Sequence, residues 1–536
     1  MVKSRFIILL LIFISSSVFA ESDWCKYIVY FKDKDYSLNI ESVFSNKALE
    51  KRRHFNILFD QRDYPVNPRY LSALQKEQVV LKQSSSWLNA VMIEAQANQA
   101  AQIAAWPFIA SITKLKEVSS LGISAVQQAD ICDEALTFED SYTSSFPQFN
   151  LLKGEYMHEQ GYNGENMTIA VCDGGFTGAN TNVCFDHIRS EGRLLGTYDY
   201  VNNDSTVYES ISHGTNVLSC IAGVINNDYI GTARKARFYL FMTENADTER
   251  LQEEFNLATA LERCAQLGVD VVNISLGYTT FDLPSENHDT SDMMKNNTPS
   301  AKAVNIASSK GILVVVAAGN EGSGTWHYIS SPSDADSAFA IAAVDVNGNP
   351  APFSGYGLAN DPRVKPNVAA VGWNMKVISS NNSIAVSSGT SFAAPSLAGM
   401  AACLWQAYPG KTNWQIKTAI EQSASQFLTP DKHIGYGIPD FQKAYQLLSS
   451  PTYVSNASLE NELVVYPNPF KSAITVRNLG ATSISDIRLT NSIGQVVYNT
   501  FNPADGQLVL NDLPKGIYLM QITTNQGLLI KKLMKD

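Results

Sequence analysis

Ser388-Gly389-Thr390-Ser391-Phe392-Ala393-Ala394-Pro395 is the stretch from which the fold and the chemistry of this chain are most directly predicted. Gly389 and Thr390 predict a tight entry into a helix, and an apolar run follows Ser391. Pro395 is expected in the first helical turn, where no backbone donor is lost. The N-terminus of such a helix carries unpaired N–H groups and a partial positive charge, which suit a developing oxyanion. The pattern therefore predicts a serine nucleophile.

Two segments upstream supply the partners that such a serine needs. Residues 167–175 read Met-Thr-Ile-Ala-Val-Cys-Asp-Gly-Gly and predict a short buried parallel strand that ends in the carboxylate of Asp173. Residues 212–217 read Ser-His-Gly-Thr-Asn-Val and predict a helix that begins near His213. A histidine can take a proton from a serine when an acid holds its other ring nitrogen. We therefore expect Asp173 as the acid, His213 as the base and Ser391 as the nucleophile.

Each of these residues also has an ordinary structural explanation. Asp173 alone fits a strand-end or turn aspartate, and His213 alone fits a histidine at a helix start. Their order decides between the explanations, because Asp, His and Ser in this sequence is the order of subtilisin and differs from the chymotrypsin and α/β-hydrolase orders. Residues 148–448 resemble the catalytic domain of the subtilase family of serine endopeptidases. The resemblance implies an α/β fold, with a mainly parallel sheet and helices on both faces.

The resemblance also implies the remaining site residues. Residues 311–322, Gly-Ile-Leu-Val-Val-Val-Ala-Ala-Gly-Asn-Glu-Gly, match the family strand whose asparagine donates to the oxyanion, which assigns that role to Asn320 beside the Ser391 backbone N–H. Asn320 alone would also fit a turn residue. Residues 269–277 match the strand that holds an extended substrate. The implied substrate contacts are Ser275, Leu276, Gly277, Ala317, Ala318 and Gly319. These small, uncharged residues favour apolar or unselective cleavage.

Some features depart from the family or lie outside its motifs. Gly174 stands where the family usually has a hydroxyl residue, and Phe392 stands where it usually has methionine. Between Gly277 and Ala301 the chain is long and polar, and loops of this kind are usually functional or mobile. Its acidic side chains are those expected of a solvated loop, and a structural calcium site is the alternative: Asp282, Glu286, Asp289 and Asp292. No cofactor is required by the predicted chemistry.

Length and composition set the wider frame. A chain of 536 residues predicts three or four domains at about 150 residues each. An apolar fraction of 45% provides for a sizeable core, and the net charge of −11 argues against nucleic acid as a partner. We expect a monomer that acts on protein or peptide substrates.

The N-terminal part predicts export and a separate module. Residues 1–20 have a positive flank, a short apolar run and a small-residue exit, as in a secretory signal peptide. Residues 21–125 resemble the α+β propeptide of subtilases, which implies an intramolecular inhibitor removed by self-cleavage in an exposed junction, residues 126–147. A permanent accessory domain is the alternative. Seven cysteines form no dense framework, although Cys25 with Cys132, and Cys184 with Cys220, are candidate pairs.

The composition changes again after the protease-like region. Residues 449–462 are typical of a linker, and residues 463–536 contain short alternating runs that predict a small β-sandwich. Tyr466-Pro467-Asn468-Pro469 and the basic end resemble the C-terminal sorting domain of type IX secretion substrates. This implies the type IX machinery as a partner and a secreted or surface-attached protein of a Gram-negative bacterium. A carbohydrate-binding or adhesion sandwich is the alternative.

The function predicted from all these features is a secreted, self-processing serine endopeptidase that works through an acyl-enzyme. The alternative is a non-enzymatic surface or adhesion protein on the same scaffold, which would have no need of Asp173, His213 and Ser391 together. A lipase or esterase is disfavoured, because Ala393 stands where the Gly-x-Ser-x-Gly motif requires glycine.

Overall fold

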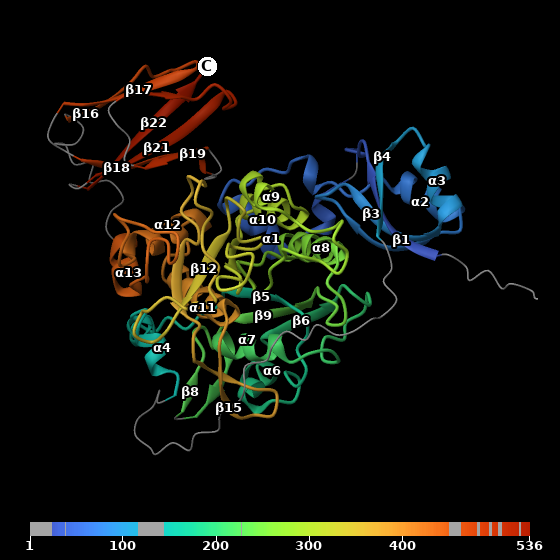
Figure 1. Ribbon diagram of the computed structural model, residues 1–536, viewed down its shortest axis with the longest axis horizontal. Coiled ribbons are helices and arrows are strands. Elements are labelled where there is room, and N and C mark those ends of the chain that lie inside the picture. The colour runs from blue at the N-terminus through green and yellow to red at the C-terminus, as the bar shows by residue number, and fades with distance from the viewer. Residues whose placement is uncertain are drawn as a thin grey trace, which may run out of the picture.

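Three folded units make up the part of the chain that the structure describes (Figure 1). The computed structural model describes residues 24–449, apart from 38, 116–143 and 227, and residues 462–536, apart from 480–482, 492–495, 502–505 and 525–526. The predicted signal peptide, most of the junction and most of the linker lie outside the described residues. The predicted fold class is confirmed: a parallel α/β unit lies between an N-terminal α+β unit and a C-terminal all-β unit.

A seven-stranded parallel sheet forms the centre of the middle unit. Its strands follow the order β13-β12-β11-β10-β5-β9-β6, and every neighbouring pair is parallel. The central strands are buried on both faces, which explains their nearly continuous apolar sequences. The strands are β5 (Thr168–Asp173), β6 (Leu194–Asp199), β9 (Arg237–Met242), β10 (Val271–Ile274), β11 (Leu313–Ala317), β12 (Phe339–Val344) and β13 (Val368–Val371).

Helices cover both faces of this sheet. Helices α7 (His213–Ala222) and α11 (Thr390–Ala407) share one apolar cluster with Val271 and Val315 of the strands. Helices α8 (Leu251–Leu267) and α10 (Pro299–Ser309) share the opposite cluster with Val272 and Val314, as strand alternation requires. The remaining elements of this unit are α4 (Phe146–Asn150), α5 (Gly154–Glu159), η3 (Val183–Phe185), α6 (Asp186–Ser190), β7 (Val224–Ile225), β8 (Tyr229–Ile230), α9 (Thr290–Lys295), β14 (Met375–Ile378), β15 (Ile384–Ser387), α12 (Asn413–Ser423) and α13 (Phe441–Ser449).

Strand register places three predicted site segments at one edge of the sheet. Cys172 lies beside Ile274, and Ile274 lies beside Val316. The next residue of each strand or following loop is Asp173, Ser275 or Ala317, so these lie at the same level. This edge carries the carboxyl ends of the strands, where open α/β sheets commonly bind ligands.

The N-terminal unit packs one face of its sheet on helix α8. Its four strands are antiparallel in the order β2-β3-β1-β4. Glu262 of α8 accepts hydrogen bonds from Ser85 Oγ and the Trp87 N–H, both at 3.1 Å, and Phe255 joins the apolar face of the sheet. The elements are β1 (Trp24–Phe31), η1 (Glu41–Val43), α1 (Asn46–His54), η2 (Gln61–Asp63), α2 (Pro68–Lys76), β2 (Val80–Ser85), β3 (Ala90–Gln96), α3 (Ala97–Ala104) and β4 (Ile109–Leu115).

The C-terminal unit consists of two antiparallel sheets around one apolar core. One sheet has the order β16-β17-β20 and the other the order β19-β18-β21-β22. Arg488 links this unit to the middle unit through Glu421 at 3.3 Å and the Tyr436 hydroxyl at 3.2 Å. The strands are β16 (Leu463–Tyr466), β17 (Ala473–Asn478), β18 (Ile484–Asn491), β19 (Val496–Phe501), β20 (Gly506–Val509), β21 (Gly516–Thr524) and β22 (Gly527–Lys535).

The cysteines, the surface charge and the helix lengths bear on the earlier predictions. Cys184 and Cys220 are both free and buried, so their predicted pairing is wrong, and Cys132 lies outside the described residues.

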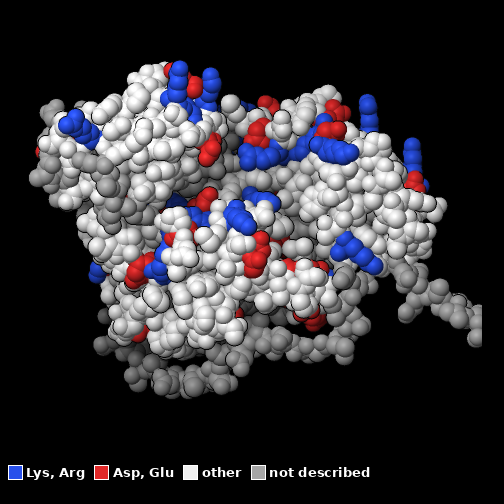
Figure 2. Space-filling view, turned by 45° about the horizontal axis from the view of Figure 1, so that its top comes forward, with Lys and Arg blue, Asp and Glu red and all other residues white. Residues whose placement is uncertain are grey.

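On the face shown in Figure 2, basic and acidic side chains are interspersed over the described surface. Within the described residues, no helix combines the length and the apolar character needed to cross a bilayer.

Candidate active site

Asp173 and His213 form a hydrogen-bonded pair at the carboxyl edge of the sheet. Asp173 is the last residue of β5 and is fully buried, and His213 is the first residue of α7. The His213 Nδ1 lies 2.9 Å from Asp173 Oδ1 and 3.1 Å from Oδ2. A second donor, the N–H of Gly174, holds Oδ1 at 2.8 Å. Both predicted positions are thus brought together, with the other ring nitrogen of His213 left for a reacting group.

The glycine after the histidine explains how α7 comes so close to the turn after β5. The Gly214 N–H donates to the Gly175 carbonyl oxygen at 2.9 Å. A Cβ on Gly214 would lie 2.6 Å from that oxygen and 2.7 Å from the ring of Phe176. Any side chain at this position would therefore push the helix, and His213 with it, away from Asp173.

The electrostatic environment of His213 raises its pKa. Burial acts to lower the pKa, but the charge of Asp173 and its hydrogen bond outweigh burial, so the pKa lies above the usual 6.5. The imidazole side chain remains 31% exposed, so an incoming substrate can reach it. This arrangement stabilises the imidazolium that forms when the ring accepts a proton.

Ser391 lies beside this pair, at the start of α11. It is the second residue of the helix and is 8% exposed. The ring of its neighbour Phe392 is 5.7 Å from the His213 ring, centroid to centroid. The Ser391 hydroxyl donates to the Ser275 carbonyl oxygen at 3.3 Å, so a rotation about χ1 is needed to direct it to His213. Such loose geometry is common before substrate binds.

The expectation for Pro395 is wrong in an informative way. Pro395 is the sixth residue of α11 rather than part of its first turn, so its missing N–H would have bonded to the carbonyl of Ser391. Ser275 Oγ donates to that carbonyl instead, at 2.8 Å, and Asn273 Nδ2 donates to Ser275 Oγ at 2.9 Å. Sequence reasoning missed this contact. Its signal was a proline four residues after the nucleophile, which leaves one helix carbonyl without its usual donor.

Asn320 is held at the start of α11 by its side-chain oxygen. It follows β11 by three residues and is exposed. Its Oδ1 accepts from the N–H of Thr390 at 2.9 Å and from the Thr390 hydroxyl at 3.0 Å. The Gly319 N–H donates to the same hydroxyl at 3.2 Å. Because the oxygen is engaged, the amide nitrogen is the end of Asn320 that remains to donate near the N-terminus of α11.

The predicted substrate contacts divide into accessible and buried residues. Leu276, Gly277 and Gly319 are at least partly accessible, whereas Ser275, Ala317 and Ala318 are buried. The side chain of Ser275 is directed at Ser391, as described above. Ser330 Oγ lies against both accessible glycines. A Cβ added to Gly277 would lie 2.1 Å from this oxygen, and one added to Gly319 would lie 2.7 Å from it. The accessible residues of this group, Leu276, Gly277 and Gly319, are therefore uncharged, and two of them have no side chain.

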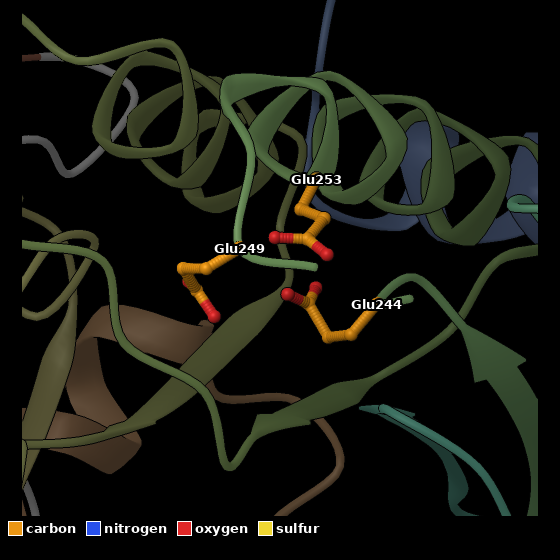
Figure 3. A group of neighbouring side chains, drawn as sticks. All are labelled: Glu244, Glu249 and Glu253. Carbon is orange, nitrogen blue, oxygen red and sulfur yellow. The ribbon is translucent and has the colours of Figure 1, made fainter. Parts of the chain in front are cut away.

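The acidic residues of the loop after Gly277 each have another partner. Glu286 pairs with Arg250 at 2.9 Å, and Asp282 accepts the Glu249 N–H at 3.1 Å. Asp289 and Asp292 form the capping box of α9. In the described part of the chain, three other carboxylates lie within 4.8 Å of one another, those of Glu244, Glu249 and Glu253 (Figure 3). Sequence reasoning did not single out these three, because they come together only in the fold.

Proximity and burial change the protonation of this cluster. Burial, with the charge of Glu249, raises the pKa of Glu244 to about 8. Burial, with the charge of Asp282, raises the pKa of Glu249 to about 7. Tyr278 and Thr243 donate to Glu244 Oε1 at 2.7 and 2.8 Å. The cluster therefore holds protons near neutral pH.

Replacing Glu244 with glutamine is expected to remove part of the pH dependence of stability. The pKa of Glu244 is raised in the folded state, so the folded protein holds this proton more tightly than the unfolded chain does. The resulting stabilisation is fully present below pH 4.5 and is lost as the pH rises to about 8. Glutamine does not titrate and still accepts from Tyr278. We expect the Tm of Glu244→Gln to exceed the parent value by several degrees at pH 8.5, with little difference at pH 5. Calorimetry in a Ser391→Ala background avoids self-digestion.

The exposed Glu209 provides the control for this comparison. Glu209→Gln removes the same charge without touching the cluster, and it should follow the parent curve at every pH. A Glu244→Gln curve that also follows the parent would contradict the proposed protonation.

Three family models match separate parts of the chain. A model described as "Subtilase family" matches residues 164–437. One described as "Peptidase S8 propeptide domain, Bacteroidota" matches residues 26–130, and one described as "Secretion system C-terminal sorting domain" matches residues 464–536.

Known proteases resemble the central part of the chain. Subtilisin DY of Bacillus licheniformis is 28% identical over 298 residues, which are 55% of this chain and 97% of that protein. Subtilisin BL of Lederbergia lenta is 30% identical over 50% of this chain and 87% of its own length. Thermophilic serine proteinase of Bacillus sp. (strain AK1) is 32% identical over 50% of this chain, but only 59% of its own length is matched.

A solved structure supports the fold independently. The epidermin leader peptide processing serine protease from Staphylococcus aureus aligns with a TM-score of 0.55 at 16% identity. The alignment covers 80% of this chain and 100% of that one. At this identity the likeness concerns the fold alone.

Proposed function

The chain belongs to the subtilase family and is a serine protease, and from this premise we propose that it cleaves peptide bonds within proteins through Asp173, His213 and Ser391. The observation that carries the proposal is the meeting of three distant segments. The end of β5 and the start of α7 hold a carboxylate and an imidazole in hydrogen-bond contact, and at the start of α11 the ring of Phe392, the neighbour of Ser391, lies 5.7 Å from the His213 ring.

The proposed reaction gives each of these side chains a separate role. His213 Nε2 takes the proton of Ser391 as its oxygen attacks the peptide carbonyl, and Asp173 stabilises the resulting imidazolium. The developing oxyanion is bound by the Asn320 amide and the Ser391 N–H. His213 then gives its proton to the leaving amine, and water hydrolyses the acyl-enzyme by the reverse roles. No step in this proposal requires a cofactor.

The flanking units support a scheme for export and maturation. The sorting-domain match indicates a secreted or surface protein of a Gram-negative bacterium, and the N-terminal unit is of the propeptide type. We propose passage through the type IX pathway, inhibition by the N-terminal unit and self-cleavage in the junction. The N-terminal sheet reaches the start of α8, where Lys26 Nζ donates to Gln252 at 3.2 Å, and α8 begins after the carboxyl end of β9. This position supports the proposed inhibition.

A fluorophosphonate probe tests the proposed nucleophile directly. The full-length protein should incorporate the probe after its N-terminal unit is removed, and Ser391→Ala should not. Ser396→Ala is the matched control, because Ser396 lies on the same helix with its hydroxyl bonded to the Phe392 carbonyl. Labelling that survives in Ser391→Ala, or a processed wild type that takes up no probe, would overturn the assignment.

Removing the amide of Asn320 is expected to slow turnover without weakening substrate binding. Asn320→Ala should lower kcat about 100- to 1000-fold with little change in KM, as the loss of such a donor does in subtilisin, a relative of this chain. Asn320→Asp keeps an acceptor for the Thr390 N–H but has no amide donor, and it should be as slow. Steady-state kinetics on a peptide substrate give both constants. An equal rise in KM instead would assign Asn320 to substrate binding.

A further inference from the structure

Part of the N-terminal unit reaches the edge of the central sheet opposite to the candidate active site. Residues 40–64, here called the clamp segment, leave the N-terminal sheet between β1 and α2 and contain η1, α1 and η2. Helix α1 packs beside α8 (Figure 1). The clamp segment meets Asp270, which directly precedes β10, and Lys310, which lies three residues before β11. They therefore lie at the amino ends of the strands, whereas Asp173 and Ser391 lie at the carboxyl ends.

Two lysines of the clamp segment enclose one carboxylate of the protease unit. Lys47 Nζ lies 2.6 Å from Asp270 Oδ2 and also donates to Thr168 Oγ1 at 2.6 Å. Lys51 Nζ lies 3.2 Å from Asp270 Oδ1 and donates to the Val269 carbonyl at 2.8 Å. The side chains of Lys51 and Asp270 are only 8% and 12% exposed. Burial alone would raise the pKa of Asp270, but the two lysines lower it, so the carboxylate is charged and depends on them.

A second ion pair runs in the opposite direction, from the protease unit into the clamp segment. Lys310 Nζ lies 2.6 Å from Asp63 Oδ2 and 2.9 Å from Asp60 Oδ2. Its side chain is 2% exposed, and that of Asp63 is 1% exposed. Asp63 also pairs with Arg52, whose guanidinium packs over the rings of Phe44 and Phe59. Clamp-segment residues that also contact one another therefore cover Lys310.

The backbones of the two units also approach closely. The Ser45 N–H donates to the Gln266 carbonyl at 2.8 Å, and Ser45 Oγ donates to the Leu267 carbonyl at 3.0 Å. A Cβ on Gly268 would lie 2.7 Å from the Ala48 nitrogen, and one on Gly311 would lie 2.7 Å from Ile57 Cδ1. The clamp segment thus satisfies the last carbonyls of α8 and fits against glycines on its partner surface.

We propose that the clamp segment is a second binding element that keeps the N-terminal unit attached to the protease after the chain is cut in the junction. Its contacts are separate from those between the N-terminal sheet and α8, and they do not involve the junction or the active-site edge. The clamp segment therefore adds affinity at the amino ends of the strands, beyond what the contacts with α8 supply. The inference rests on the proposed function only for the identity of the cut.

The test makes the cut with another protease, so that it does not depend on catalysis by this chain. The full chain carries Ser391→Ala and a recognition site for a sequence-specific protease inserted within residues 116–143. After cleavage, gel filtration over a dilution series measures the Kd between the two fragments. The parent fragments should elute together. Lys47→Met with Lys51→Met leaves the buried Asp270 without a cation, with the Thr168 N–H as its remaining donor, and should raise the Kd about 100-fold or more.

The matched control is Arg53→Met, which removes one positive charge from an exposed position of the same helix. All these variants leave the sequence of the protease unit unchanged. The Arg53 variant should retain the parent Kd. If the uncut double variant does not fold, as judged by its unfolding transition, Lys47→Met alone carries the test. Its side chain is 37% exposed, and about tenfold weakening is expected.

Two results would overturn the inference. In one, the parent fragments separate as readily as those of the double variant. In the other, the lysine variants hold the fragment as tightly as the Arg53 control does. A failed proposed function gives a different pattern: tight association in this assay, together with a wild-type protein that takes up no fluorophosphonate.

Discussion

Ser391→Ala is expected to lower peptide hydrolysis by about a millionfold, the scale of the loss in subtilisin when its serine or histidine is removed. The alanine leaves α11 and its contacts intact, because the Ser391 carbonyl still accepts from Ser275 Oγ. Only the attacking oxygen is lost, so KM should change little. The variant should also keep its full length where the wild type shortens. Kinetics on a peptide substrate and mass spectrometry of the purified chain measure the two effects.

The comparison needs a correctly folded variant in the same processed form. A trace of active wild type, added and later removed, tests whether the junction of Ser391→Ala can be cut in trans. Equal unfolding transitions for the two proteins exclude misfolding. If the processed variant keeps more than about one thousandth of the wild-type kcat, another nucleophile is at work and the assignment of Ser391 is wrong.

Asp173→Asn is expected to lower kcat by about 10,000-fold near neutral pH. The Gly174 N–H holds Oδ1 of residue 173, so the amide nitrogen of asparagine would face His213. His213 Nδ1 would then have to accept a hydrogen bond, which places the ring proton on Nε2. In this tautomer Nε2 cannot take the proton of Ser391, although the geometry of the site is preserved.

The same substitution should move the acid limb of the pH profile. The base must be neutral, so kcat/KM of the wild type rises as pH increases through the His213 pKa, which Asp173 holds above 6.5. Without the charge, burial lowers that pKa, and the limb should move to lower pH. Asp247→Asn, at an exposed position, is the control and should keep both the rate and the limb. An unchanged limb in Asp173→Asn would contradict the pairing of these two residues.

Local patterns carried most of the fold prediction. The apolar run of β5 ends at Asp173, and α7 begins at His213, as strand length and helix-start signals indicated. In the N-terminal unit, the apolar composition of residues 87–93 by itself predicts a strand over the whole range, but a turn precedes β3, which begins at Ala90. The β2–β3 turn places Trp87 against Glu262 of α8, so a contact between units decided this boundary.

In the candidate site, too, some side chains could be predicted from local motifs and others depended on contacts between distant segments. Asp173, His213, Ser391 and Asn320 were recognisable from short motifs, because each motif combines a reactive residue with the small neighbours that its backbone requires. Ser275 was predicted to face the substrate, but its side chain supports Ser391. Its contact with substrate stays a prediction. The support of Ser391 was missed because the missing donor at Pro395 depends on where α11 begins, and helix boundaries are the least certain part of a sequence prediction.

The order of the units, the parallel α/β class and the candidate reactive residues could all be predicted from the sequence. These properties follow from periodicity, glycine and proline positions and residue type, all of which act within a few residues of the chain. Three features became visible only in the folded chain: the support of Ser391 by Ser275, the carboxylate cluster around Glu244, and the contacts of the clamp segment with Asp270 and Lys310. Their partners lie far apart in the chain, and which charges or hydroxyls meet depends on the packing of whole elements, to which no local pattern refers.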